Sequence, residues 1–571
     1  MPRAPRAELR AALGVAAAVA IVVASAWAAE VRPLALLDPD AHAAVRAFVR
    51  GLFPADLSWP FLCVVAAAAI RTVEVAIAGT VLSVAIGLPL GILATATVFR
   101  RGPLLEGEPR ASGAALLAAA SAAARVVLGV LRAVPDLIWA LFFVVAVGLG
   151  PIAGVLALAV SYGGVLGRVF ADLFEDVDLG PVIALRATGA TRAQLFLFGI
   201  WPQALPSAVA YTLYSFECCV RAAAVLGLIG AGGIGYEIAL SMRLFEYGQI
   251  VTLTGALLAL VWLTDACSTA LRRALRANAP PGVLAHKRLA AALPRTSARA
   301  VALLAVGAAI GSCGVAAALS GGDALDASAL GRMAHFARGL VPPDLSPGYL
   351  ASLGRPVIQT IGISVIGTLL GVAIGGVLGV PATAPHAEDD RARGAAYLAR
   401  LAMRRLCRAA LSLLRAVPEV LWVLVFILAV GLGPFAGTLA LGVHTGGVLG
   451  KLYADTFEEV SPLPLRGLRS TGATPLQILV WGAWPEARRM LVSYTVLRWE
   501  MNLRTSTVVG LAGGGGVGIA LYNAVQLGFY AQVATLIAVV YLMIAGTGWI
   551  GDRIRRRLDA PGRSTRVRPG T

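Results

Sequence analysis

The chain has 571 residues, of which 58% are hydrophobic and 14% charged, and its mean hydropathy is +0.80. This composition excludes an ordinary water-soluble enzyme and predicts a polytopic membrane protein. The net charge of +17 does not indicate a nucleic-acid partner, because the Arg residues gather at the ends of apolar runs and in short loops. The six cysteines have no metal-ligand spacing, so we expect no metal site.

Apolar runs predict twelve membrane helices and no strands. In half one they lie near 11–29, 72–98, 122–149, 151–170, 203–229 and 249–271. In half two they lie near 300–320, 360–382, 405–432, 434–453, 486–512 and 531–550. The first run follows three Arg residues and looks like a signal peptide, but we interpret it as a retained helix because half two has a counterpart. The expected fold is therefore an all-α polytopic membrane protein.

The sequence contains an internal repeat that spans about half of the chain. The segment Leu131-Arg-Ala-Val-Pro-Asp-Leu-Ile-Trp139 returns as Leu414-Arg-Ala-Val-Pro-Glu-Val-Leu-Trp422, an offset of 414 − 131 = 283. We predict two fused domains, 1–271 and 300–571, which are parallel repeats of about six helices each and are joined by a basic linker at 272–299. An even number of crossings in each half puts the basic loops and both termini on one face, which is predicted to be cytoplasmic.

Two short polar segments precede the second helix of each half. They read Phe53-Pro-Ala-Asp-Leu-Ser58 and Val341-Pro-Pro-Asp-Leu-Ser346. Proline fixes the backbone, and Asp or Ser is able to cap free N–H groups. We therefore expect turns at a helix entrance on the external side.

A longer polar loop separates the fourth and fifth helices of each half. It contains Leu185-Arg-Ala-Thr-Gly-Ala-Thr191 in half one and Leu468-Arg-Ser-Thr-Gly-Ala-Thr474 in half two, and each copy leads into a Trp-Pro pair. We expect a short helix, a Gly that permits a sharp backbone passage, a second short helix and a Pro that opens the next span. Such a loop offers a compact convex surface to a partner.

At these residues the chain resembles the phosphonate-transport permeases, a family of binding-protein-dependent ABC importers. The Arg-Ala-Val-Pro segment, the Gly-x-Gly-Gly-x-Gly turn and the external Pro-x-Asp-Leu-Ser carry the resemblance together with the loop. It implies a type I importer permease of the MetI-like fold, in the cell inner membrane, with two ABC ATPase subunits and an extracytoplasmic substrate-binding protein as partners. ATP and Mg would be bound by the ATPase subunits, and membrane lipid surrounds the chain.

The same resemblance assigns the polar loops as coupling loops to the ATPase. The residues that carry over are Leu185, Arg186, Thr188, Gly189, Ala190 and Thr191, and in half two Leu468, Arg469, Thr471, Gly472, Ala473 and Thr474. The family usually has Glu six residues before the central Gly, where this chain has Ile183 and Arg466. One hypothesis is that Glu175 and Glu458 serve in docking instead, and the other is that one half couples more weakly to the ATPase.

Nucleotide chemistry is not expected on this chain. Its Gly450-Lys451 pair is followed by Leu452 and lacks the earlier Gly of a phosphate-binding loop. The Gly230–Gly235 segment lacks a strand-turn-helix context, so a break at the external end of the fifth helix is the simpler interpretation. We expect no cofactor and no enzymatic activity.

Charged residues within the apolar runs are the candidates for the translocation pathway. Glu217 and Arg221 are four residues apart, as are Glu500 and Arg504, so each pair shares one helix face. Each pair is either a structural ion pair or a source of cationic donors for a phosphonate anion. Two alternatives stay open: an ABC permease for another solute such as an amino acid, and a secondary transporter coupled to ions through membrane carboxylates such as Asp265.

Overall fold

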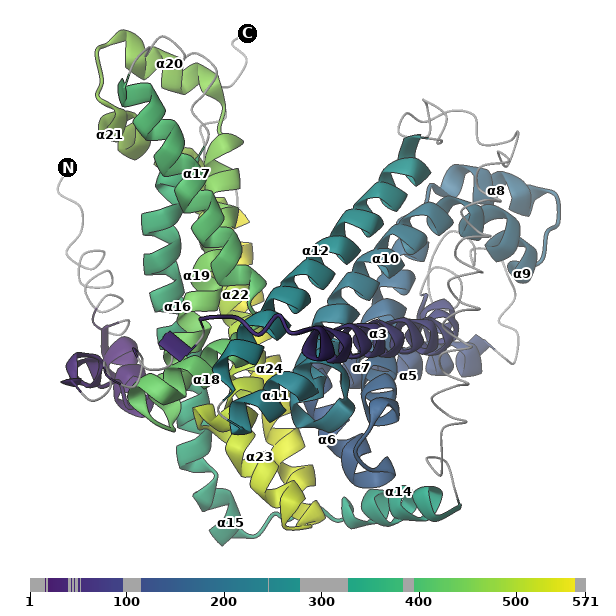
Figure 1. Cartoon of the computed structure of the whole chain (residues 1–571). Coiled ribbons are helices and arrows are strands. Elements are labelled where there is room, and N and C mark those ends of the chain that lie inside the picture. Colours follow the sequence, from purple (N-terminus) through teal and green to yellow (C-terminus); the bar gives the residue numbers. More distant parts are fainter. Residues whose placement is uncertain are drawn as a thin grey trace, which may run out of the picture. The chain divides into compact units, whose positions relative to one another are not determined.

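The computed structural model describes residues 19–39, 53–95, 114–244, 246–277, 327–383 and 395–559, with isolated positions between 16 and 51. Its described elements are helical, and they form two compact units. One comprises Phe48–Val341 and is called here the first-half unit; the second-half unit comprises Met1–Ala47 and Pro342–Thr571. Figure 1 shows the helices of each.

The helices of the first-half unit are α3 (Trp59–Ala94), α5 (Ala114–Ala133), α6 (Asp136–Val147), α7 (Pro151–Glu175), α8 (Leu179–Ala187), α9 (Arg192–Gln194), α10 (Trp201–Leu226), α11 (Gly233–Arg243), α12 (Tyr247–Ala277) and α14 (Ala327–Gly339). Those of the second-half unit, after a short helix at Val19–Ala28, are α15 (Pro347–Ser352), α16 (Gly354–Ala382), α17 (Ala395–Ala416), α18 (Glu419–Val430), α19 (Pro434–Glu458), α20 (Pro462–Ser470), α21 (Pro475–Gln477), α22 (Trp484–Val509), α23 (Val517–Gln526) and α24 (Tyr530–Asp559).

The described residues contain six helices long and apolar enough to cross a membrane, or up to nine if each bent pair is one span. The predicted helix at 300–320 and most of the linker lie outside the described residues. Where predicted helices can be compared, their ends differ: α3 begins at Trp59 rather than near 72, and α24 ends at Asp559 rather than near 550. Charged side chains near a helix end stop an apolar run in the sequence without stopping the helix.

The predicted helices 122–149 and 405–432 are each bent into two. In the first, α5 and α6 meet at an angle of 87°, and in the second α17 and α18 meet at 93°. The break falls within the repeated Arg-Ala-Val-Pro motif, because Pro disfavours helical backbone at the residue before it. The indole Nε1 of Trp139 donates to the Leu131 carbonyl at 3.3 Å, and Trp422 does the same to Leu414 at 3.2 Å. The motif therefore encodes a fastened corner.

The first segment of each half packs with the other half of the chain. In the second-half unit, Glu30 accepts hydrogen bonds from Arg355 at 3.0 Å and Gln359 at 3.1 Å, both on α16. In the first-half unit, Phe336 of α14 packs edge-on against Phe142 of α6 with ring centroids 4.6 Å apart. The division into 1–271 and 300–571 thus stays a prediction about the repeats. The compact units are divided differently, because residues 1–47 pack with the second half and residues up to 341 pack with the first.

Each unit is built on one close pair of helices. A Cβ on Gly87 of α3 would lie 2.8 Å from the Gly163 carbonyl oxygen of α7, and a Cβ on Gly379 of α16 would lie 2.7 Å from that of Gly450 of α19. Small residues at such contacts allow backbones to approach in a membrane, where packing replaces the hydrophobic effect between helices. These pairs, α3 with α7 and α16 with α19, form the scaffold that carries the polar loops.

Candidate coupling loops and membrane charges

The two polar loops have the same local structure. Gly189 has φ +83° and Gly472 has φ +82°, and their N–H groups donate to the Arg186 and Arg469 carbonyls at 2.9 and 3.0 Å. Glycine adopts this left-handed conformation without steric cost, which explains its place after α8 and α20. Nothing lies within 4 Å of the position of a Cβ on either Gly. The loop apex is therefore open on its outer side.

A capping box starts the short helix after each Gly. The Thr191 N–H donates to Gln194 Oε1 at 2.8 Å, and the Gln194 N–H donates to Thr191 Oγ1 at 3.4 Å. Thr474 and Gln477 repeat both distances. Thr followed three residues later by Gln is a helix-start signal that is readable in the sequence. Of the predicted loop residues, Thr188, Gly189 and Thr191 are exposed, as are Thr471, Gly472 and Thr474, whereas Leu185, Arg186, Ala190, Leu468, Arg469 and Ala473 are half-buried.

Each loop is seated on a hydrophobic cluster. In half one, Val182 of α8 is fully buried among Phe174, Phe196 and Ile200, with Trp201 packed against them. In half two, Leu465 of α20 takes the equivalent place. Because these side chains come from the end of one span, the loop and the start of the next, a push on the loop is transmitted to both spans.

Glu175 and Glu458, which the sequence suggested as docking residues for the ATPase, instead contact neighbouring helices of their own unit. Glu175 forms an ion pair with Arg125 of α5, whose Nε also donates to the Ala94 carbonyl at the end of α3 at 2.7 Å. Glu458 pairs with Arg408, whose Nε donates to the Ala382 carbonyl at 2.9 Å. These contacts argue against the hypothesis that the two Glu residues dock the ATPase. They tie the helix before each polar loop to its neighbours.

Glu458→Gln is expected to lower the free energy of unfolding by about 1–3 kcal/mol, because two cations would lose a charged acceptor. Arg404 lies 3.8 Å from Glu458 in addition to Arg408, while Ser121 stands at the equivalent place in half one. Glu175→Gln is the matched variant and is expected to cost less. Thermal unfolding in detergent would compare the two, and an equal loss would contradict the role given to Arg404.

The predicted break after the fifth helix is present in both halves, and hydrogen bonds to a neighbouring helix hold it in place. Gly233 has φ +75° and Gly516 also +75°. The next N–H groups, of Ile234 and Val517, donate to Thr72 Oγ1 at 2.9 Å and Thr360 Oγ1 at 2.8 Å. A Cβ on Gly233 would lie 2.4 Å from that hydroxyl oxygen, so only Gly fits. The Gly-rich motif is thus a structural corner.

The predicted pathway charges are differently placed in the two halves. Glu217 of α10 is buried, at 7% exposure, whereas Arg221 is exposed and its Nη2 donates to Cys218 Sγ at 3.5 Å. On α22, Glu500 Oε2 lies 3.5 Å from Nη2 of Arg555, which belongs to α24. For Glu500 the structure therefore supplies a partner that helix spacing did not predict. Arg504, one turn further on, is half-buried.

Half two also holds polar groups that the sequence reasoning missed. Asn502 of α22 is fully buried; its amide nitrogen donates to Thr368 at 2.8 Å and its oxygen accepts from Thr445 at 3.0 Å. Cys219, Tyr162 and Thr80 occupy these places in half one. Because the three half-two groups come from distant segments, only the repeat alignment could have drawn attention to them. They join α16, α19 and α22 through one amide.

A second cluster in half two lies at the corner between α17 and α18. The His444 ring has Nδ1 3.1 Å from the Val417 carbonyl oxygen and Nε2 3.7 Å from Glu419 Oε2. Half one has Ser161 in place of His444. The imidazole thus helps to fasten this corner, and the two halves are chemically unequal.

The Pro-Asp segments before α3 and before α15 form turns with the same hydrogen bonds. The Ser58 N–H donates to Asp56 Oδ1 at 3.0 Å, and the Asp56 carbonyl accepts from Thr252 of α12 at 2.8 Å. The Ser346 N–H donates to Asp344 at 3.0 Å, and the Asp344 carbonyl accepts from Thr535 of α24 at 2.7 Å. Each turn therefore holds the entrance of one span against the start of the last helix.

Acid is expected to loosen these turns. Hydrogen bonds from the neighbouring Ser side chain and backbone lower the pKa of Asp56 and of Asp344 below 3.8. A lowered pKa stabilises the fold above the unfolded-state value, and this contribution is lost as the pH falls through the folded-state value. Hydrogen exchange of the Ser58 and Ser346 amides, corrected for intrinsic rates, should show constant protection from neutral pH to about 5 and a decline below about 4. A decline near pH 6 would contradict this origin.

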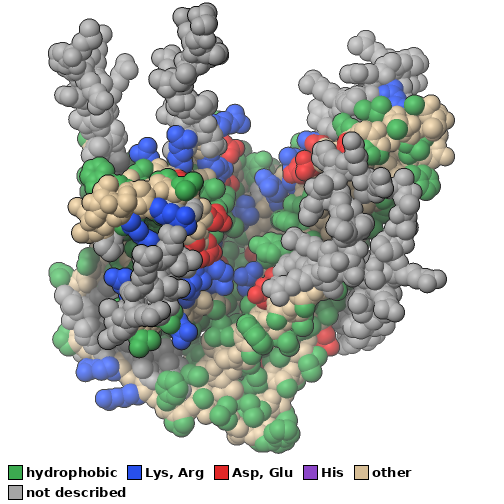
Figure 2. Space-filling view, turned by 90° about the horizontal axis from the view of Figure 1, so that it is seen from above, with side chains coloured by type: hydrophobic (Ala, Val, Ile, Leu, Met, Phe, Trp, Pro, Cys, Tyr) green, Lys and Arg blue, Asp and Glu red, His purple; other side chains and the backbone are tan. Residues whose placement is uncertain are grey.

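Figure 2 shows one face of the molecule, on which more Lys and Arg than Asp and Glu side chains are visible. The described helices form two repeated apolar bundles, and each bears one rigidly seated loop with an open apex. These features define a polytopic helical membrane protein.

Comparison with known proteins gives the family. The sequence model of the protein family "Binding-protein-dependent transport system inner membrane component" matches residues 111–278 and 392–560, which is one match in each half. The chain therefore belongs to this family, and it carries two copies of the permease domain. The phosphate-import permease protein PhnE of Mycolicibacterium smegmatis is 31% identical over 540 residues, which cover 93% of each chain.

Shorter relatives match a smaller part of the chain. The phosphite transport system permease protein PtxC of Stutzerimonas stutzeri is 34% identical over 212 residues, covering 37% of this chain and 72% of that protein. Among solved structures, the inward-facing MetNI methionine ABC transporter has 22% identity and a TM-score of 0.33, and the match covers 38% of this chain and 99% of that one. The predicted resemblance to an ABC importer permease is thus confirmed by the family match.

Proposed function

We propose that this chain imports phosphorus oxyanions, the class that includes phosphonate, phosphite and phosphate esters, as the fused permease of an ATP-driven transporter. The observation that carries the proposal is the 31% identity, across 93% of both chains, to a permease named for phosphate import. Shorter relatives are named for phosphite transport. The exposed Arg221 on α10 supplies a cation suited to such an anion.

Each coupling loop would receive one ATPase subunit, so that one chain replaces two separate permease subunits. The seat of Val182, Phe174 and Phe196 supports this role because it joins the loop rigidly to the spans on either side. ATP and Mg would be held by the ATPase subunits, and an extracytoplasmic binding protein would deliver the substrate. Both termini would lie in the cytoplasm, on the side of the basic loops.

Exposed apolar side chains stand beside the exposed Thr residues of the predicted docking surface in both halves. Ile183 is 46% exposed, and Leu463 of α20 is 71% exposed. With Ile183 and Arg466 in place of the family's usual Glu, docking would depend on apolar contact and on shape rather than on that carboxylate. Alternating access then follows when closure of the ATPase pair displaces both loops and their seats.

The test is ATP-dependent uptake into proteoliposomes that contain this chain, its ATPase and its binding protein, each of the last two also omitted in turn. Uptake of labelled phosphonate or phosphite that requires both partners is the expected result. ATPase stimulation by the binding protein loaded with an amino acid, without phosphonate uptake, would overturn the substrate class. Uptake that persists without the ATPase would overturn the ATP-driven mechanism.

A further inference from the structure

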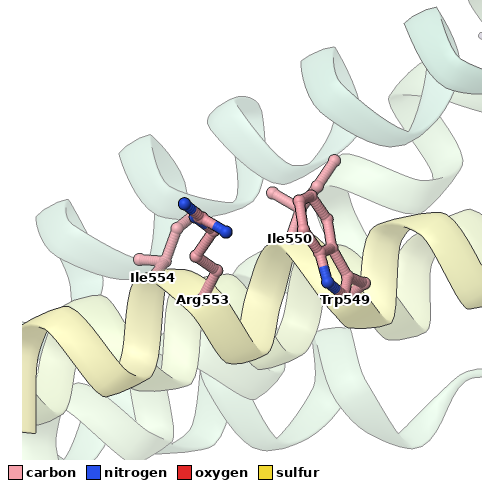
Figure 3. Close-up of a pocket in the computed structure, with 4 residues that line it drawn as sticks. All are labelled: Trp549, Ile550, Arg553 and Ile554. Atoms are coloured by element: carbon pink, nitrogen blue, oxygen red, sulfur yellow. The ribbon is translucent and has the colours of Figure 1, made fainter.

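The last helix of the chain carries an open hollow of about 480 Å³, whose lining is almost wholly apolar. Its described lining residues are Trp549, Ile550, Arg553 and Ile554. Their spacing of one and four residues places them on one face of α24, and Figure 3 shows the side chains rising from that face with Arg553 between Ile554 and Trp549. The hollow therefore combines aliphatic and aromatic surface with a single cation.

The cation has a defined environment. The guanidinium carbon of Arg553 lies 5.3 Å from the centroid of the Trp549 ring, a cation–π contact. Arg555, two residues on, is instead engaged with Asp552 at 2.6 Å and Glu500 at 3.5 Å. The two Arg residues thus have different roles. Arg555 joins α24 to α22, whereas Arg553 and Trp549 lie on the exposed side of α24, where Trp549 is 63% exposed.

The position along the span matches a membrane interface. The apolar span that contains these residues runs from Tyr530 to Arg556, so the hollow lies in its last two turns. Trp is enriched at the level of the lipid headgroups, where its ring is apolar and its N–H is polar. Basic residues directly beyond a span attract anionic lipid headgroups, and this end continues with further Arg residues in the sequence.

Half one provides an internal comparison. Its last helix aligns with α24 at the same offset of 283, since Thr252 and Thr535 make equivalent bonds to the external turns. Ala266 and Ala270 of α12 then stand where half two has Trp549 and Arg553. The Trp and Arg are therefore not required by the repeated fold, and they form a feature of half two alone.

We propose that this face of α24 is a binding site for one anionic phospholipid, whose phosphate pairs with Arg553 while an acyl chain lies in the hollow against Trp549, Ile550 and Ile554. Charge complementarity selects an anionic headgroup, and the apolar lining selects a lipid rather than free phosphate. The site rests on the membrane location of the chain and not on its transport substrate.

The experiment is native mass spectrometry of the purified full-length chain, exchanged from detergent that contains phosphatidylglycerol or phosphatidylcholine. We expect one retained phosphatidylglycerol that survives exchange, and about fivefold weaker retention in Arg553→Gln. Arg556→Gln is the matched control, because it removes the same charge from an exposed residue of the same helix that does not line the hollow. Trp549→Ala should weaken retention as well, and Arg553→Lys should largely preserve it.

A gain-of-function variant guards against misfolding as the cause of any loss. Ala266→Trp with Ala270→Arg copies the pair into half one and is expected to add a second retained lipid. Equal retention in Arg553→Gln and Arg556→Gln would overturn the site, as would equal retention of phosphatidylcholine. Displacement of the lipid by millimolar inorganic phosphate would show a simple anion site and would also contradict the proposal.

Discussion

Gly189→Trp and Gly472→Trp are each expected to leave the chain folded in the membrane and to reduce transport by about tenfold or more, as a bulky side chain in the middle of an interface does. Both glycines have open space around the position of a Cβ, so the Cβ of the new side chain would meet no part of its own chain. It would project from the loop toward the ATPase. ATPase activity should then continue without driving uptake.

Two controls separate bulk from backbone strain. Gly189→Ala keeps the loop small but imposes a left-handed backbone on Ala, at a cost of about 1 kcal/mol. Gly255→Trp places the same indole on the exposed surface of α12, where again nothing lies within 4 Å. Uptake and ATPase rates in proteoliposomes are the readouts. Full transport in both Gly-to-Trp variants would remove the coupling role assigned to these loops.

The second large effect is expected from replacing Arg221 and Arg504 together by Gln. A charge-assisted hydrogen bond contributes about 1.5–3 kcal/mol, so loss of one such contact in transit should reduce phosphonate uptake by about tenfold or more. Assembly with the ATPase should persist, because neither residue lies near the coupling loops in the sequence. The measurement is uptake at several substrate concentrations together with ATPase stimulation.

Arg71→Gln is the matched control for this charge removal, because half two already has Gln359 at that position. It should leave uptake unchanged. If the double Gln variant transports as well as Arg71→Gln does, the Arg residues are structural, and Arg221 serves its contact with Cys218 rather than the substrate. If instead the double variant is lost from the membrane, the two single variants will show which of the two Arg residues is needed for folding.

Local sequence signals predicted the loops well, because their geometry depends on neighbours in the chain. The Gly that ends α8 and the Thr-x-x-Gln box that starts α9 act over three or four residues. The same is true of the apolar spans and of the corner at Gly230–Gly235. The Arg-Ala-Val-Pro motif was recognised but its meaning was not, since the Trp139 bond that fastens the corner spans eight residues.

The partners of membrane charges could not be predicted in this way. The spacing along the helix predicted Arg504 as the partner of Glu500, but the packing of α24 against α22 places Arg555 beside Glu500. Likewise Glu175 and Glu458 looked free for docking until α5 and α17 placed an Arg beside each. Buried charges take the best partner available in three dimensions, because an unpaired charge in this environment is costly.

By its own pattern, then, the sequence determined a duplicated, helical membrane protein with one polar loop in each half, because apolar length, repeat and helix caps are local properties. Only the tertiary structure decided how the corners bend, which carboxylate pairs with which Arg, and that Glu30 packs on α16 while α14 packs on α6. Those features depend on contacts between residues that are up to 329 positions apart. No local pattern specifies such contacts, since they arise when separate helices compete for the same neighbours.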